Sequence, residues 1–134
     1  MTKNIYFKRE THESLIIIDC DFPNHKIALA LDTGASHTTI DLTALLIAGF
    51  EIKNALRIEQ IETAAGIIEA MVFRVPKFSA LGITRENIEI SAYDFFAHGV
   101  LAEFDGVLGL DFIDKYKICI DFNHSIITLF DNFK

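Results

Sequence analysis

The sequence has little of what several protein classes require. Its 134 residues include no Trp, two Pro and two Cys, and 12 Lys and Arg stand against 19 Asp and Glu. The formal net charge of -7 argues against a nucleic-acid or membrane-surface partner, because both attract clustered basic residues. A hydrophobic content of 51% argues against disorder. We therefore expect residues 1–134 to form one folded domain.

Signals for export, membrane insertion and metal binding are also missing. The longest apolar run, near residues 44–50, is too short for a membrane span or a signal peptide. Cys20 and Cys119 lie far apart, which suits a reducing compartment, although a disulfide between them stays open. The His and Cys residues show no spacing typical of metal ligands. We expect a cytoplasmic protein with no cofactor, no metal and no membrane partner.

Strand patterns fill most of the chain. Apolar β-branched runs or two-residue alternation predict strands at residues 15–20, 26–31, 38–40, 56–62, 67–75, 88–95, 118–122 and 126–130. Short helices are predicted before Gly49 and near residues 112–116, and residues 82–87 are predicted to be a loop. Residues 1–11 could form a terminal arm. The pattern is that of a mostly β domain.

The hairpin predicted over residues 56–75 has an unusual tip. Its connection is Thr63-Ala64-Ala65-Gly66, which combines small residues with a glycine. Such a tip projects from the sheet and lets another backbone approach closely. The same glycine is equally well explained by hairpin geometry alone.

The stretch from Leu29 to Ser36 contains the main candidate for chemistry. An apolar strand ends there in Asp32, followed by Thr33 and Gly34. A carboxylate where a buried strand becomes a tight turn loses solvation, so its protonation can be adjusted by its surroundings. The plain alternative is that Asp32 caps a turn in an inactive sheet domain.

A second acidic pattern suggests different chemistry. Residues 16–21, with Asp19 and Asp21 after an apolar run, resemble the nucleophile strand of haloacid-dehalogenase phosphatases. Pro23 stands at a position where the phosphatase motif requires Thr or Val. No convincing pair of acidic residues that could bind magnesium follows in the sequence. The end of a paired strand is the better interpretation of this segment.

In the order of its parts, the chain resembles the retropepsin-like aspartic proteases. The Asp32-Thr33-Gly34-Ala35 motif follows a hairpin, the small-residue hairpin comes next, and an apolar-apolar-Gly segment ends at Gly109. The resemblance covers roughly residues 15–130. It implies an all-β, closed-sheet acid-protease barrel with two short helices and a flap hairpin. The run at 109–112, continued at 119–121, looks more like the cellular DNA-damage-inducible branch than the viral branch.

The resemblance also assigns roles to individual residues. Asp32 is the implied catalytic aspartate, and Thr33, Gly34 and Ala35 complete the active-site loop. The implied substrate-binding or pocket-supporting residues are Ser36, His37, Ala64, Ala65, Gly66, Val107 and Leu108. Ala35 stands where pepsin-type enzymes carry serine, and Leu110 replaces an arginine of viral enzymes.

The chemistry of such an enzyme needs two carboxylates. One takes a proton from water and the other, protonated, polarises the amide carbonyl. Asp32 lies in the sole Asp-Thr-Gly motif, and Asp105-Gly106 lacks the intervening hydroxyl. The prediction is therefore a homodimeric aspartic endopeptidase that cleaves extended peptide or protein segments, with an acidic working pH. The alternative is a catalytically silent, dimeric peptide-binding domain of the same fold.

Overall fold

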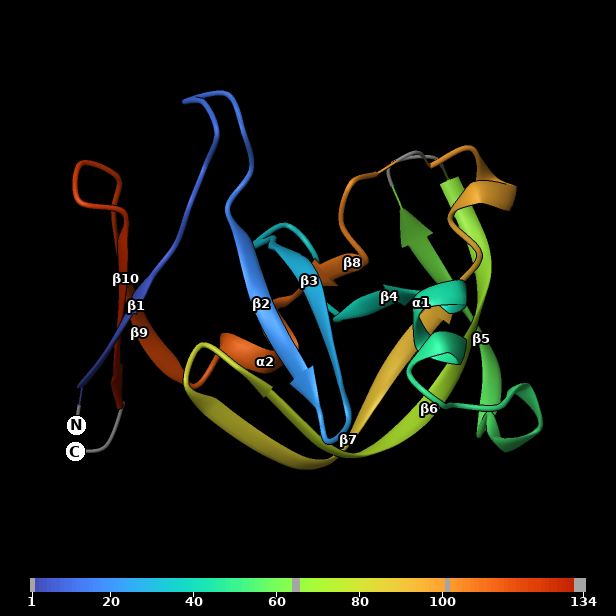
Figure 1. Ribbon diagram of the computed structural model, residues 1–134. Coiled ribbons are helices and arrows are strands. Elements are labelled where there is room, and N and C mark those ends of the chain that lie inside the picture. The colour runs from blue at the N-terminus through green and yellow to red at the C-terminus, as the bar shows by residue number, and fades with distance from the viewer. Residues whose placement is uncertain (1, 64–65, 101, 132–134) are drawn as a thin grey trace.

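The computed structural model describes residues 2–63, 66–100 and 102–131 (Figure 1). The alanines predicted at the hairpin tip, Ala64 and Ala65, lie outside the described residues. No helix within the described ranges is long and apolar enough to cross a membrane. The architecture is mostly β, with two short α-helices.

Six strands form a closed, mixed barrel. Around the barrel they follow the order β2 (Ile17–Phe22), β3 (His25–Leu31), β8 (Gly106–Leu108), β4 (Thr39–Asp41), β7 (Ile83–Tyr93) and β6 (Gly66–Ala80). The pairing of Cys20 with Ala80 joins β2 back to β6 and closes the barrel. The β3–β8 and β4–β7 pairs are parallel, whereas the other pairs are antiparallel. A closed barrel places the alternate apolar side chains of every strand inside.

The flap hairpin extends from this barrel. β5 (Arg57–Thr63) pairs with the first part of β6, from Arg57 opposite Val72 to Thr63 opposite Gly66. The rest of β6 continues into the barrel beside β7. The hairpin is therefore an outward continuation of barrel strands (Figure 1).

A separate three-stranded sheet contains the first and the last described strands. Its order is β1 (Thr2–Tyr6), β10 (Ile126–Asp131) and β9 (Tyr116–Asp121). Ile127 and Leu129 of β10 are buried in the core, which anchors this sheet to the barrel. Part of the expected terminal arm is thus a strand on the C-terminal hairpin of its own chain.

The loop predicted at residues 82–87 is wrong. β7 begins at Ile83, and the turn before it is made by Leu81 and Gly82, both at positive φ. The ladder keeps one register from Met71 opposite Ala92 to Ala80 opposite Ile83, and it skips only the position where Asn87 faces Pro76, which has no N–H to donate. The polar residues 84–87, which look like a loop in the sequence, therefore lie within a strand.

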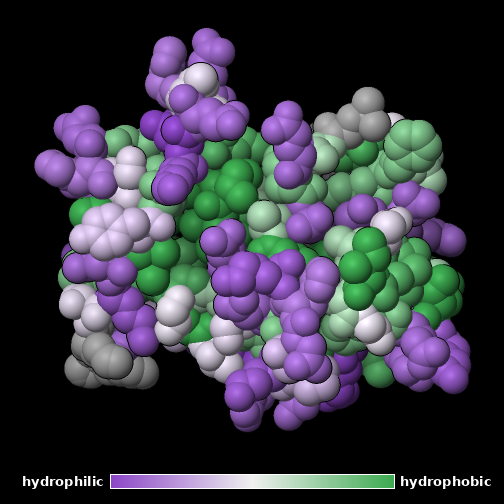
Figure 2. Space-filling view, viewed as in Figure 1, coloured by the Kyte–Doolittle hydropathy of each residue, from purple (hydrophilic) through white to green (hydrophobic). Residues whose placement is uncertain are grey.

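The helices are short, and the second begins at Leu110, two residues before the predicted stretch 112–116, and ends at Ile113. α1 (Leu42–Ile47) follows β4, and α2 (Leu110–Ile113) follows β8. Two single 3₁₀ turns, η1 (Ile52–Asn54) and η2 (Phe96–His98), lie in the connections. Figure 2 shows polar side chains over much of one face and an apolar area on the side where α1 lies. The exposed Ile47 and Ile52 belong to α1 and η1.

Candidate active site

Strand β3 delivers Asp32 to a turn beside β8. The Asp32 N–H donates to the Leu108 carbonyl at 3.1 Å, and the Asp32 carbonyl accepts from the Ala35 N–H at 3.2 Å. The half-buried carboxylate accepts the Gly34 N–H at its Oδ1, at 2.8 Å. A Cβ at Gly34 would lie only 3.1 Å from that oxygen. The turn therefore fixes the direction of the Asp32 carboxylate.

The residues after Asp32 face outward. Thr33, Gly34, Ser36 and His37 are exposed, and Ala35 is half-buried. The Ser36 hydroxyl lies 3.2 Å from His37 Nδ1. In a single protomer this surface is therefore open to solvent.

The segment after β8 holds the Asp32 loop from behind. The Leu110 N–H donates to the Ala35 carbonyl at 2.8 Å, and the Asp111 N–H donates to the Ser36 carbonyl at 3.2 Å. A Cβ at Gly109 would come within 2.7 Å of the His37 carbonyl carbon. Glycine is therefore required at position 109 for the two backbones to approach this closely.

A buried side-chain pair strengthens this contact. Thr38 is only 2% exposed, and its hydroxyl donates to Asp111 Oδ1 at 2.7 Å while accepting the Gly109 N–H at 3.1 Å. The Thr38 N–H also donates to Asp111 Oδ1 and Oδ2, at 2.9 and 3.0 Å. The sequence reasoning gave neither residue a role. The available signal was Asp111 itself, a carboxylate in the first turn of a helix after glycine.

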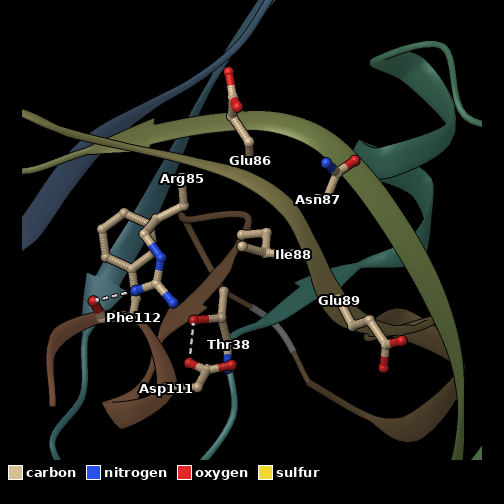
Figure 3. A pocket seen from close by; sticks show the side chains of 8 residues that line it. All are labelled: Thr38, Arg85, Glu86, Asn87, Ile88, Glu89, Asp111 and Phe112. Atoms are coloured by element: carbon tan, nitrogen blue, oxygen red, sulfur yellow. Dashed lines mark hydrogen bonds between the residues drawn. The ribbon is translucent and has the colours of Figure 1, made fainter. Parts of the chain in front are cut away.

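A polar pocket lies next to this pair (Figure 3). It has a volume of about 320 Å³ and is lined by Thr38, Arg85, Glu86, Asn87, Ile88, Glu89, Asp111 and Phe112. The Arg85 guanidinium donates to the Phe112 carbonyl at 3.1 Å and lies 5.5 Å from the centre of the Phe112 ring. Asp32 does not line this pocket, so the pocket is separate from the candidate catalytic carboxylate.

The other candidate residues take different places. Val107 is half-buried and paired with both Ala30 and Thr39, while the Leu108 side chain is fully buried in the core. Leu108 thus contacts the site through its carbonyl, which accepts the Asp32 N–H. Gly66 begins β6 at a φ of 115°, and its carbonyl accepts the Thr63 hydroxyl at 2.8 Å.

The remaining acidic candidates do not join Asp32. Asp105 Oδ2 accepts the Ala28 N–H at 3.0 Å, and the Asp105 N–H donates to the Ala28 carbonyl at 2.7 Å. The Asp105 carboxylate is therefore hydrogen-bonded to Ala28 of β3, four residues before Asp32. Asp19 and Asp21 lie within β2 and are exposed, instead of following a strand as the phosphatase pattern requires. Within the described ranges, no three His, Cys, Asp or Glu side chains are grouped to hold a metal.

Comparisons with known proteins agree with this geometry. The sequence profile of a family described as Aspartyl protease matches residues 18–112, which include Asp32 and the Thr38–Asp111 pair. A crystal structure of a retropepsin-like aspartic protease from Rickettsia conorii has a TM-score of 0.69 and 21% identity, covering 96% of this chain and 91% of that chain. No curated protein sequence matches the chain. The predicted retropepsin-like fold is confirmed, and the chain belongs to the aspartyl protease family.

Proposed function

We propose that this protein is an aspartic endopeptidase that works as a homodimer, with one Asp32 from each subunit. The observation that carries the proposal is the Asp32 turn. Its carboxylate is directed by the Gly34 N–H at 2.8 Å, and the residues that follow are exposed. One protomer supplies one such carboxylate, and a two-fold axis through this surface would supply the second.

Two facing Asp32 carboxylates account for the reaction. Like charges this close do not both ionise readily, so the pair shares one proton. The ionised carboxylate takes a proton from water as the water oxygen attacks the amide carbon, and the protonated carboxylate donates to the carbonyl oxygen. Transfer of a proton to the amide nitrogen then releases the amine and the acid.

The surroundings of Asp32 suit an extended substrate. The exposed carbonyl of Gly34 would accept a hydrogen bond from a peptide, and the flap hairpin would lie over that peptide as a neighbouring strand. Half-buried Val107 would contribute apolar surface near the cleaved bond. We propose substrates with apolar side chains on both sides of that bond.

We also place the protein nearer the cellular DNA-damage-inducible branch than the viral branch. Leu110 occupies the position of the viral arginine, so an ion pair that braces viral dimers has no counterpart at that position. Asp111 instead accepts hydrogen bonds from Thr38. This placement is supported by residues 109–112 and 119–121 alone.

Replacement of Asp32 tests the proposal. Asp32→Asn keeps the shape of the turn but removes the acid and base, so cleavage of an apolar fluorogenic peptide library should fall at least about 1,000-fold. Sedimentation should show unchanged assembly. Asp19→Asn, an exposed change within β2, is the matched control and should retain full activity.

Two results would refute the proposal. Full cleavage by the Asp32→Asn variant would remove Asp32 from the mechanism. A wild-type protein that binds peptides without cutting any member of the library, at any pH from acidic to neutral, would be the silent peptide-binding domain instead.

A further inference from the structure

A second cavity lies between the end of β4 and the segment that leads from η2 to β8 (Figure 1). It has a volume of about 420 Å³, within the range of about 300–1,000 Å³ typical of ligand pockets. Its walls include three phenylalanine rings, one valine and two carboxylates, namely Phe95, Phe96, Phe104, Val100, Asp41 and Glu103. Among the described residues, no Lys, Arg or His side chain lines it. The cavity is therefore aromatic and acidic.

The aromatic wall is held in place through Phe95. The Phe95 N–H donates to Asp41 Oδ1 at 3.1 Å, and the Phe95 carbonyl accepts the Val100 N–H at 2.9 Å. The Phe95 ring packs on the Tyr93 ring with 4.7 Å between their centres. Phe96, in η2, is by contrast 78% exposed, so its ring is open to contact with a ligand.

The two carboxylates of the cavity have no cation of their own. Asp41 precedes α1, but its side chain makes no capping hydrogen bond to that helix and accepts the Phe95 N–H instead. Glu103 is exposed, and within the described part of the chain neither carboxylate forms an ion pair. Both therefore keep acceptor positions for a charged donor.

The sequence around the cavity has a single sign of charge. No Lys or Arg occurs in residues 27–52 or in residues 86–114, although these segments contain three and seven acidic residues. The first segment includes Asp32 and Asp41, and the second includes Glu103 and β8. A region with charges of one sign attracts ligands of the opposite sign. A cationic ligand is therefore favoured there.

The pocket beside Thr38 differs in this respect. It already contains a cation, Arg85, whose guanidinium donates to the Phe112 carbonyl (Figure 3). The cavity at Asp41 instead offers rings and carboxylates that suit a planar cation. A guanidinium stacks on an aromatic face and donates to carboxylates as a fork, whereas an ammonium is compact and strongly hydrated. An arginine side chain is therefore the best match.

The cavity lies within reach of a peptide held at Asp32. Phe104 comes four positions before Leu108, whose carbonyl accepts the Asp32 N–H. Four residues of chain span at most about 14 Å. An extended peptide covers that distance in about four residues as well. A substrate with its cleaved bond at Asp32 can thus place a more distant side chain in the cavity.

We propose that this cavity binds an arginine side chain of the substrate, about three to five residues from the cleaved bond. The guanidinium would stack on the Phe96 ring and donate to the carboxylates of Asp41 and Glu103. The inference rests on the proposed endopeptidase, and it adds one basic residue to the apolar substrates inferred for it.

Binding can be measured without cleavage. Nα-acetyl-arginine amide, added to ¹⁵N-labelled protein, should shift the Phe95 amide resonance in a saturable way, because this N–H bonds to Asp41 at the cavity. The citrulline analogue has the same shape without the charge and should bind at least about fivefold more weakly. Equal binding of the two compounds, or shifts confined to other resonances, would overturn the assignment.

Matched variants connect this binding to the cavity. Glu103→Gln removes one charge and Phe96→Leu removes one aromatic face, both at exposed positions, so each should weaken arginine binding about threefold to tenfold. Glu86→Gln removes an exposed charge at the other pocket and should stay within about twofold of wild type. An equal loss in Glu103→Gln and Glu86→Gln would indicate a general effect of net charge and contradict the site.

Peptide pairs that differ only in arginine or citrulline test the role in cleavage. When the pair is scanned along an apolar peptide, arginine should raise kcat/KM about fivefold over citrulline at one position, mainly through KM. Glu103→Gln should bring this ratio to about one, and Glu86→Gln should keep it. Cleavage without preference at any position refutes only this inference. Binding of the arginine compound at Phe95 without cleavage of any peptide contradicts the proposed endopeptidase and not the cavity.

Discussion

One buried hydroxyl joins the two segments that form the candidate site. Thr38 Oγ1 donates to Asp111 and accepts from Gly109, so it uses both its donor and an acceptor position. The Asp32 carboxylate is oriented by a hydrogen bond from the Gly34 N–H, only two residues further along the chain. The turn at Gly34 therefore sets the direction of the Asp32 carboxylate, and Thr38 attaches the loop around Asp32 to α2.

Thr38→Val should destabilise the protein by about 1–3 kcal/mol, because it leaves the Gly109 N–H without its buried acceptor. Urea unfolding measures the change. Thr39→Val is the matched control: Thr39 is also buried, but its hydroxyl makes only a 3.3 Å bond to the His37 carbonyl. Its loss should cost less, and an equal cost for both variants would contradict the role given to Thr38.

The two cysteines should differ sharply in reactivity. Burial, followed by the charges of Asp21 and Asp19, raises the pKa of the Cys20 thiol from 9.0 to about 12. The thiolate is the reactive form, so at a pH near 8 the folded protein holds roughly 1,000-fold less Cys20 thiolate than an unshifted thiol would give.

Iodoacetamide should thus label one thiol, the exposed Cys119, in dilute native protein and both thiols in denaturant. Mass spectrometry counts the labels. Cys119→Ser should take up none in the native state. Rapid labelling of Cys20 in the folded protein would show that its burial is transient.

Among the structural elements, the crossing of β4 and β8 leaves the least room. Gly106 has a φ of 156°, and a Cβ there would lie 2.1 Å from the Thr39 carbonyl oxygen. Gly106→Ala should therefore cost about 3 kcal/mol or more, since backbone atoms would have to move. Thermal unfolding would detect the loss.

Gly99→Ala separates this clash from backbone strain. Gly99 has a φ of 76°, but a Cβ there meets nothing within 4 Å. This variant should lose only about 1 kcal/mol. Similar losses in both variants would mean that the β4–β8 contact is less tight than the structure indicates.

Sequence pattern located the strands better than the contacts between them. The hairpins and both helices follow from alternation and turn residues, whereas the polar residues 84–87, with Asn87 at a positive φ, hid the start of β7. The Asp32 motif was visible because its residues are adjacent. The Thr38–Asp111 bond joins residues 73 positions apart, and no local pattern reports such a contact.

At the scale of the whole molecule, activity should require two intact copies of Asp32. Mixing wild-type protein with about a ninefold excess of Asp32→Asn, under conditions where dimers exchange, puts about one tenth of the wild-type chains in dimers with two Asp32. Cleavage should then fall to roughly one tenth of that of the same wild-type amount alone.

The reason is that a mixed dimer retains one carboxylate and one amide, and cannot both accept a proton from water and donate one to the carbonyl. Adding the same excess of a Cys119→Ser protein, which keeps Asp32, should increase cleavage instead. Unchanged cleavage after equilibration with Asp32→Asn would mean that each chain acts alone. A single Asp32 would then need a second acid within its own protomer, and Asp105, bonded to Ala28, is directed elsewhere.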